Sequence, residues 1–558
     1  MKKTKLISEK TLILLALILY VIVYFSPLGI RPMISPDEPR YAEIAREMID
    51  SSDWITAHLD GVRYLEKPVM GFWWIAIAMK VFGVNGFSAR FPSALAAGLV
   101  GLLLFSLVRR KTGDRYGGLL ASVIFLTFGM VYVLGTSCIP DTVFTLFVTA
   151  TLTFFYFSHQ QERFSKKLLF LSLAGVFFGL GFLTKGLVAL VIVVLAVTPF
   201  MIWERRFIEL LKLFWIPLVA AAVVALPWSI LIHLTNSDFW HYFIWTSHIE
   251  RFVGGSASTN LHSEPFWYYL PILLGGTAPW IILLPSVISG VKREDFTKPI
   301  FRFTLCWLIF PLLFFSVSSG KLGTYILPLL PAVAILFTIG LHSYIKSGHN
   351  KSFSYSTAFL GAVMWITLLY LIVSFFIHDP KFALFSRDEL PKRVGAFVCV
   401  GLWMILLIRL YGAKKLKTAV FTFALAPLFL LVSSPLIFPD VVKEHKIPDG
   451  FYTEYCQNIE PDAMVLGYKH SAYVAAWYLK RDDIYFYINP GVLKYALAHD
   501  DQMDRVIDID EFPVIVEEKS RTTPVYLFLN GYQYDRYLDK LPEPASIDIY
   551  GIFLILKF

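Results

Sequence analysis

Long apolar segments separated by short polar ones recur along most of this 558-residue chain. A bilayer core requires roughly 20 mostly apolar residues per helix, and many segments here are about that long. The pattern therefore predicts a polytopic α-helical membrane protein with about thirteen transmembrane helices. The predicted spans are residues 11–29, 88–108, 119–137, 141–157, 168–184, 186–203, 213–234, 266–290, 299–317, 323–344, 355–377, 394–410 and 418–438.

Basic residues gather at alternate connections between these spans. Cytoplasmic loops carry an excess of Lys and Arg, so we expect a cytoplasmic N-terminus and, after an odd number of spans, a C-terminus outside, in the periplasm of a Gram-negative cell. The first segment follows several lysines but has no small-residue cleavage site, so we interpret it as a retained helix. The basic connections are Arg109-Arg110-Lys111, Arg163 with Lys166-Lys167, Arg205-Arg206, Lys292-Arg293, Lys346 with Lys351, and Lys414-Lys415 with Lys417.

Three longer segments fall on the outer side in this topology: a first loop at residues 29–87, a second loop at 235–265 and a tail at 440–558. The alternation of short apolar runs and helix-like stretches in the tail predicts a small periplasmic α/β domain, which leaves residues 1–439 as a transmembrane catalytic domain. Strands are expected at 463–466, 484–487, 524–529 and 551–556, and a helix at 471–479.

Composition and charge agree with a membrane protein and exclude other classes. Hydrophobic residues make up 56% of the chain, charged residues only 16%, and the mean hydropathy is +0.61, which an ordinary soluble domain does not reach. The net charge of +8 follows the membrane topology, so it does not indicate a nucleic-acid partner. The four cysteines stand singly, and neither a disulfide framework nor a thiolate metal site is expected.

Candidate chemistry begins directly after the first span, in the run Ser35 to Glu43. Asp37 and Glu38 lie near the predicted start of a helix at residues 40–49, where the helix dipole favours carboxylates. One interpretation is that Asp37 only caps this helix. The other is that Asp37 and Asp141, which opens the fourth span from the same side, form a site, because a carboxylate at a membrane edge requires a partner or an aqueous cavity.

Further along the first loop, Glu66 and Lys67 follow Tyr64 and precede an aromatic run. The stretches at 40–49 and 68–82 are amphipathic and are predicted to lie along the membrane interface. A Lys beside an aromatic interfacial surface suits a lipid phosphate, although any interfacial helix can show the same pattern.

Other cations and a histidine complete the candidate set. Arg251 has the planar fork that suits a phosphate, and His248 could be a ligand, a proton carrier or simply a satisfied polar residue. Lys185 and Lys321 stand in very short turns on the outer side, where basic residues are few, and this favours an anion-accepting cavity.

With these motifs in order, the sequence resembles the lipid A 4-amino-4-deoxy-L-arabinose transferases, within the protein O-mannosyltransferase-like enzymes of the GT-C fold. The resemblance covers most of the first 330 residues and departs from the expected pattern at Gly323, where a Pro is expected. The matching motifs are Asp37-Glu38-x-Arg40-Tyr41-Ala42-Glu43, Arg63-Tyr64-x-Glu66-Lys67-Pro68, Asp141, Thr184-Lys185-Gly186, Phe239-Trp240-His241-Tyr242-Phe243, His248-Ile249-x-Arg251-Phe252, Pro265 to Pro271, and Gly320-Lys321-Leu322-x-Thr324-Tyr325-Ile326.

The resemblance implies a thirteen-helix inner-membrane enzyme with its active site facing the periplasm, an undecaprenyl phosphate-aminoarabinose donor and a lipid A phosphate acceptor. It also implies a divalent metal ion between Glu66 and His248, for which the sequence shows no third ligand. Catalytic roles are assigned to Asp37, Asp141 and Glu66, phosphate binding to Lys67, Arg251, Arg40, Lys185 and Lys321, and substrate binding to Tyr41, Tyr64 and Tyr325.

Two other functions are compatible with the sequence. A related enzyme would use another polyprenyl-phosphate sugar or a protein acceptor. A flippase or transporter for lipid-linked sugar would instead have its charged residues near the bilayer midplane in broken helices. Here the charged candidates gather in outer loops and at helix ends, which favours the transferase.

Overall fold

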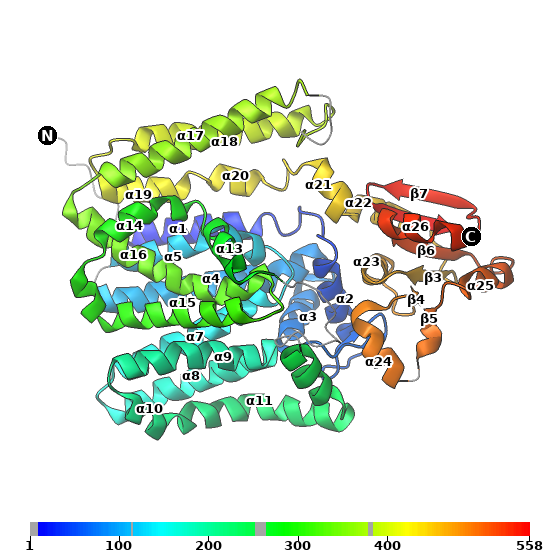
Figure 1. Ribbon diagram of the computed structural model, residues 1–558, viewed down its shortest axis with the longest axis horizontal. Coiled ribbons are helices and arrows are strands. Elements are labelled where there is room, and N and C mark those ends of the chain that lie inside the picture. Colours follow the sequence, from blue (N-terminus) through cyan, green and yellow to red (C-terminus); the bar gives the residue numbers. More distant parts are fainter. Residues whose placement is uncertain (1–8, 113–114, 251–263, 378–382, 501) are drawn as a thin grey trace.

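The computed structural model describes residues 9–112, 115–250, 264–377, 383–500 and 502–558. A body of long, nearly parallel helices forms one part, and a smaller α/β domain lies at one end of it (Figure 1). Helices α2 and α3 lie between the two parts, at the end of the body that faces the α/β domain.

Within the described ranges, nine helices are long and apolar enough to cross a membrane. Each overlaps a span that the hydropathy pattern predicts. They are α4 (Gly86–Thr112), α7 (Asp141–His159), α8 (Phe164–Lys185), α11 (Trp215–Thr235), α15 (Pro299–Val317), η6 with α16 (Gly323–Leu329 and Leu330–Ser347), α17 (Lys351–Val373), α18 (Leu390–Leu410), and α19 with α20 (Leu416–Leu425 and Leu428–Ser433).

The remaining predicted spans coincide with bent or shorter helices, so the count of thirteen stays a prediction. Two apolar helix pairs are sharply bent, by 68° and by 93°, and α1 and α9 have 17 residues each. The elements concerned are α5 (Arg115–Leu126) with α6 (Gly129–Gly135), η3 (Phe266–Tyr268) and α13 (Tyr269–Gly276) with η4 (Trp280–Leu283) and α14 (Leu284–Gly290), α1 (Glu9–Phe25) and α9 (Leu187–Trp203). Shorter connecting helices are α10 (Phe207–Leu213), η1 (His241–Glu250) and η5 (Arg293–Thr297).

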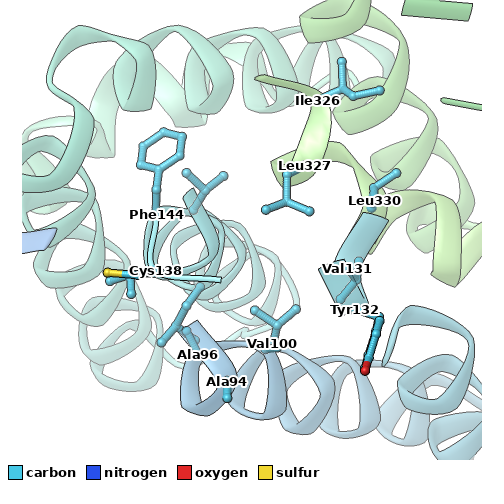
Figure 2. Packing of buried hydrophobic residues seen from close by; sticks show 14 of the residues in the cluster. Ala94, Ala96, Val100, Val131, Tyr132, Cys138, Phe144, Ile326, Leu327 and Leu330 are labelled. Atoms are coloured by element: carbon cyan, nitrogen blue, oxygen red, sulfur yellow. The ribbon is translucent and has the colours of Figure 1, made fainter. Parts of the chain in front are cut away.

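A core of buried apolar side chains joins α4, α6, α7 and η6 (Figure 2). Small residues of α4 let the neighbouring helices approach closely, as is usual for packed membrane helices. This core fixes the first turn of α7 against η6, and so it sets where Asp141 and Tyr325 lie. The labelled side chains are Ala94, Ala96, Val100, Val131, Tyr132, Cys138, Phe144, Ile326, Leu327 and Leu330.

The first loop folds into α2 (Asp37–Asp50), the two-stranded ribbon β1 (His58–Leu59) and β2 (Val62–Arg63), and α3 (Met70–Phe82). Helix α2 is buried over most of its length, including the charged residues Glu38, Arg40, Glu43, Arg46 and Glu47. The prediction that it lies along the membrane interface is therefore wrong: α3 and the C-terminal domain cover it instead of lipid. Helix α3 keeps an exposed apolar face with Ile77 and Val81, as an interfacial helix would.

The C-terminal domain contains a six-stranded sheet in the order β5-β4-β3-β6-β8-β7, in which β5, β4, β3 and β6 are parallel and β8 is antiparallel to both of its neighbours, β6 and β7. The four predicted strands are present, whereas the two-residue β5 and the exposed edge strand β7 were missed. The elements are α21 (Asp440–Lys446), α22 (Asp449–Cys456), β3 (Met464–Gly467), α23 (His470–Leu479), β4 (Tyr485–Tyr487), η7 (Gly491–Leu493), α24 (Lys494–His499), η8 (Met503–Arg505), β5 (Val506–Ile507), α25 (Phe512–Lys519), β6 (Val525–Asn530), α26 (Gly531–Tyr537), η9 (Leu538–Lys540), β7 (Ser546–Tyr550) and β8 (Phe553–Lys557).

Candidate active site

A buried carboxylate fixes the start of α2. Glu38 accepts hydrogen bonds from the Arg90 and Arg31 guanidinium groups and from the backbone amides of Ile34 and Cys138. Burial would raise the pKa of Glu38, but the charges of Arg90 and Arg31 prevail and lower it to about 2. The carboxylate is therefore ionised at neutral pH and joins α2, α4 and the turn before α7.

Asp37 stands beside this clamp with its side chain turned outward. It is the first residue of α2, directly after the N-cap residue Pro36, and its side chain is 57% exposed. Its carboxylate pairs with Arg40 one turn later, at 2.6 Å. The interpretation of Asp37 as a mere helix cap therefore has no support in its contacts.

Asp141 and Lys185 form an ion pair where two membrane helices meet. Asp141 opens α7, Lys185 ends α8, and Oδ1 and Nζ are 2.6 Å apart, with side chains only 9% and 12% exposed. The Thr324 side chain also hydrogen-bonds the Asp141 carboxylate. Lys185 lies 5.4 Å from the ring centroid of Tyr325, which brings a third predicted residue to the same place. A charged pair at a helix end is tolerated here because each group compensates the other.

The turn after Lys185 explains one of the sequence motifs. Gly186 has a φ of +63°, a conformation that favours glycine, and a Cβ there would lie 2.3 Å from the Phe243 ring. The glycine therefore lets the second loop close over the end of α8.

Two cations, Lys67 and Arg40, contact the Tyr41 side chain. The Lys67 ammonium donates a hydrogen bond to the Tyr41 hydroxyl and lies 4.3 Å from the ring centroid, and Arg40 donates to the same hydroxyl at 3.1 Å. Burial, and then repulsion from Arg40, lower the pKa of Lys67, while the Asp141 and Glu66 carboxylates act in the opposite direction. Lys67 thus belongs to the same electrostatic environment as Asp141.

Glu66 completes this arrangement from the first loop. Its Oε2 accepts a hydrogen bond from the Tyr64 hydroxyl at 3.0 Å, and its charge acts on Tyr41 and Lys67. We refer to Asp37, Arg40, Glu66, Lys67, Asp141 and Lys185 as the charged cluster. Chain segments distant in sequence, α2, the loop before α3, and the facing ends of α7 and α8, build it.

Two predicted residues that the structure describes, Lys321 and His248, have hydrogen-bond partners among the backbone carbonyls. Lys321 is buried and donates hydrogen bonds to the carbonyls of Ser318 and Glu264, at 2.6 and 2.7 Å. His248 has Nδ1 2.7 Å from the Phe243 carbonyl and Nε2 3.4 Å from that of Lys185. Arg251 lies outside the described residues, so its placement is not tested.

The described residues do not assemble a metal site. No group of three His, Cys, Asp or Glu side chains suited to a metal ion occurs in those parts of the chain. Both ring nitrogens of His248 lie near backbone carbonyl oxygens, those of Phe243 and Lys185. The metal ion between Glu66 and His248 remains a prediction, and no chemical step is derived through it.

Arg63, in β2 of the first loop, pairs with Asp238 of the second loop, at 2.9 Å, and with Asp500 of the C-terminal domain. It borders a polar cavity of about 630 Å³ in which no residue of the charged cluster takes part. Arg63 and Tyr64 are neighbours in the chain, so this contact ties both loops and the domain together beside the cluster.

Sequence reasoning missed Arg90, Arg31 and the approach of α23 to the site. The sequence did contain a signal for Arg90, because it lies inside the predicted apolar span 88–108, where an Arg requires a partner. The structure shows that Arg90 is fully buried. The approach of α23 had none, because it depends on how the C-terminal domain packs against α2.

Sequence comparison relates both parts of the chain to known families. Residues 10–243 match the family described as dolichyl-phosphate-mannose-protein mannosyltransferase, and residues 443–557 match the family described as arabinosyl transferase ArnT, C-terminal domain. The chain is 34% identical over 554 residues to the undecaprenyl phosphate-alpha-4-amino-4-deoxy-L-arabinose arabinosyl transferase of Shewanella sediminis, covering 99% of this chain and 98% of that protein. A protein of the same name from Erwinia tasmaniensis is 35% identical over 542 residues, covering 95% and 96%.

Crystal structures of ArnT from Cupriavidus metallidurans share the fold. The structure bound to undecaprenyl phosphate has a TM-score of 0.81 at 20% identity and covers 99% of this chain and 98% of that chain. The apo structure has a TM-score of 0.78 at 20% identity and covers 98% of each. The predicted GT-C-type helical membrane fold is thereby confirmed.

Proposed function

This chain belongs to the family of undecaprenyl phosphate-alpha-4-amino-4-deoxy-L-arabinose arabinosyl transferases, and we propose that it moves 4-amino-4-deoxy-L-arabinose from undecaprenyl phosphate to a phosphate of lipid A. It is a glycosyltransferase that uses a polyprenyl-phosphate sugar. The observation that carries the proposal is the charged cluster, in which three cations and three carboxylates meet where the membrane helices end.

The reaction requires one bond to form and one to break at the anomeric carbon. A phosphate oxygen of the acceptor attacks this carbon, and the bond between the carbon and the undecaprenyl phosphate oxygen breaks, with its electron pair going to that oxygen. If the acceptor phosphate is dianionic, no proton moves, since the leaving phosphate gains the negative charge that the acceptor loses. A strong general base is therefore unnecessary, whereas a protein hydroxyl acceptor would need one.

The cations of the site suit the phosphates. Lys67 and Lys185 would compensate the charge that grows on the leaving phosphate, and Arg40 would assist. We assign the same role to Arg251 and Lys321 on the strength of the sequence motifs alone.

The carboxylates and tyrosines suit the sugar. Asp37 and Asp141 would pair with its ammonium group and stabilise positive charge at the anomeric carbon, with Glu66 beside them. Hydroxyls and ring faces for the sugar would come from Tyr41, Tyr64 and Tyr325. Asp37 is suited to this role by its exposure, which leaves the carboxylate accessible.

The proposed setting is the bacterial inner membrane, with the cluster facing the periplasm, where lipid A on the outer leaflet can reach it. Capping lipid A phosphates with a cationic sugar lowers the negative charge of the surface and would give resistance to polymyxin and other cationic peptides. Membrane lipids are the other expected partners, and no nucleic acid is.

A reconstituted assay tests the proposal. The purified full-length chain in proteoliposomes receives lipid A and either undecaprenyl phosphate-aminoarabinose or a mannose lipid donor. Transfer of aminoarabinose alone is expected, and transfer of mannose to a protein hydroxyl would favour the mannosyltransferase alternative. Movement of the intact donor between leaflets without transfer would favour a flippase. Growth in polymyxin of a knockout carrying this gene is the matching cellular test.

A further inference from the structure

The C-terminal domain reaches the charged cluster through α23. This helix packs beside α2 (Figure 1). At its start, His470 interacts electrostatically with Arg40 and Asp37; at its end, Lys480 interacts with Glu43 and Asp50. The two helices therefore run in the same direction, and the first turn of α23 lies next to the part of α2 that carries the cluster.

The residues at this first turn lie at the surface of their domain, where the His470 ring is 5.8 Å from that of the buried Tyr473. His470 is exposed, whereas residues 472–477 behind it are buried. Lys469 is half-buried and, among the residues that the structure describes, it contacts the ring of Tyr468 at 5.9 Å and pairs with no carboxylate. An accessible imidazole and an uncompensated ammonium thus stand at the edge of the cluster.

A sharp turn between β3 and α23 places Lys469 and His470 at the start of the helix. Lys469 has a φ of +48°, which side chains rarely adopt, and its amide donates a hydrogen bond to the Asn489 carbonyl at 2.9 Å. Gly467 allows the close approach, because a Cβ there would lie 2.4 Å from the amide nitrogen of Ala472. The turn before α23 thus combines an unfavourable φ at Lys469 with a close backbone approach at Gly467.

The net charge of the cluster shows why further cations beside it would help to bind phosphate. The charged cluster has three cations, Arg40, Lys67 and Lys185, against three carboxylates, so it is formally neutral. The proposed reaction brings two phosphates together, one on the donor and one on the acceptor. The neutral cluster does not compensate both phosphates by itself. Arg251 and Lys321 are the other cations assigned to phosphate, and Lys469 adds positive charge from a second domain.

We propose that Lys469 and His470 bind the acceptor phosphate, a phosphate monoester on a lipid-linked saccharide, and that the C-terminal domain thereby forms part of the acceptor site. The polyprenyl chain ties the donor phosphate to the membrane, whereas Lys469 and His470 belong to the domain beyond the end of the helical body. The saccharide headgroup of the acceptor projects toward that domain. This inference rests on the proposed function.

His470 acts here as a neutral hydrogen-bond donor. Desolvation by the surrounding protein, and then the charge of Arg40, lower the pKa of His470 to about 4 although the residue keeps contact with solvent, so the imidazole is neutral and carries one N–H at neutral pH. Lys469 supplies the charge-assisted hydrogen bond.

The test measures initial rates in proteoliposomes containing the full-length enzyme. Lipid A is varied at saturating undecaprenyl phosphate-aminoarabinose, and the donor is then varied at saturating lipid A. Lys469→Gln and His470→Ala are expected to raise the KM for lipid A, by about tenfold or more for Lys469→Gln, with the KM for the donor nearly unchanged. Lys469→Arg should restore a low KM for lipid A.

Two further variants separate binding from folding. Lys469→Gly removes the charge but relieves the left-handed backbone, so it should stay folded and still raise the KM for lipid A. Lys480→Gln is the matched control: this lysine also has a positive φ, +56°, but stands at the far end of α23, and its KM values should match wild type.

Three results would overturn the inference: a wild-type KM for lipid A in both Lys469→Gly and His470→Ala, an equal rise in the KM for the donor, or a rise in Lys480→Gln as large as in Lys469→Gln. Failure of the wild-type enzyme to glycosylate lipid A contradicts the proposed function itself, and it is seen before any variant is measured.

Discussion

The Arg90 guanidinium holds the Glu38 carboxylate by two hydrogen bonds, from Nε to Oε1 at 2.8 Å and from Nη2 to Oε2 at 2.9 Å. Both side chains are almost completely buried. The same carboxylate accepts the backbone amide of Cys138, three residues before Asp141. One buried ion pair therefore sets the position of α2 relative to α7, and with it the relation between Asp37 and Asp141.

Replacing Glu38 with Gln should destabilise the protein strongly. The change leaves Arg90 and Arg31 buried without an anion, and breaking a buried pair in this way costs about 3 to 5 kcal/mol. A lower unfolding temperature in detergent is expected, together with loss of transfer. Asp37→Asn, one residue away but exposed, is the control and should unfold at the wild-type temperature. Equal unfolding temperatures for Glu38→Gln and wild type would contradict the clamp.

The same pair predicts a loss of stability in acid. The pKa of Glu38 is about 2 in the folded protein and 4.5 for an unperturbed Glu side chain, so the group stabilises the fold fully above about pH 4.5 and loses this contribution as the pH falls toward 2. The difference corresponds to about 3 kcal/mol. The unfolding temperature should fall further between pH 7 and pH 3 for the wild-type protein than for Glu38→Gln. A parallel fall would show that Glu38 does not titrate in this range.

The helices were predictable because the length and apolar character of a segment indicate a membrane span whatever the segment packs against. The clamp was not, because Glu38 and Arg90 are 52 residues apart and meet only after α2 and α4 pack. For the same reason, the burial of α2 could not be predicted. Its amphipathic pattern is compatible with a membrane surface and equally with packing against α3 and α23. Among the predicted site residues, those beside helix ends converge, since the bundle brings such ends together. His470 carries no local signal and depends on domain packing.

Lys67→Ala should accumulate normally in the membrane and transfer poorly. A charge-assisted hydrogen bond to phosphate is worth about 1.5 to 3 kcal/mol, or roughly ten- to a hundredfold in rate. Tyr41→Phe removes the hydroxyl that orients Lys67 and Arg40 but keeps the ring, so its loss should be smaller, about 0.5 to 1.5 kcal/mol. Initial transfer rates at fixed protein amount measure both. Wild-type transfer by Lys67→Ala would remove this lysine from the site.

The topology is open to cysteine labelling with a membrane-impermeant reagent. Because all four native cysteines are buried, background labelling should be low. We expect Lys166→Cys and Lys415→Cys to be protected in cells with a permeabilised outer membrane, and cysteines at Tyr325 and at Tyr532 of the C-terminal domain to react. Tyr532 is 71% exposed, which makes it the cleaner reporter. Protection at Tyr532 with reaction at Lys415 would reverse the orientation and place the cluster on the cytoplasmic side.

Asp37 and Asp141 provide the sharpest test of the chemistry. Asn has nearly the shape of Asp and can still cap a helix, but it removes the charge. If the two carboxylates only stabilise helix ends, Asp37→Asn and Asp141→Asn should change little. If they face the reacting sugar, each should abolish or severely reduce lipid A modification while the protein stays folded.

Asp141→Asn alone leaves Lys185 without its 2.6 Å partner, so a folding defect could imitate a catalytic one. The double variant Asp141→Asn with Lys185→Met removes both charges and keeps most of the apolar volume, so it should accumulate normally and still lack activity. Asp37→Asn needs no such compensation, because Asp37 is exposed. Mass spectrometry of lipid A from a complemented knockout decides between the two roles. Near-normal aminoarabinose addition by Asp37→Asn and by the double variant would exclude both carboxylates from the reaction, since charge facing the sugar is what these substitutions delete.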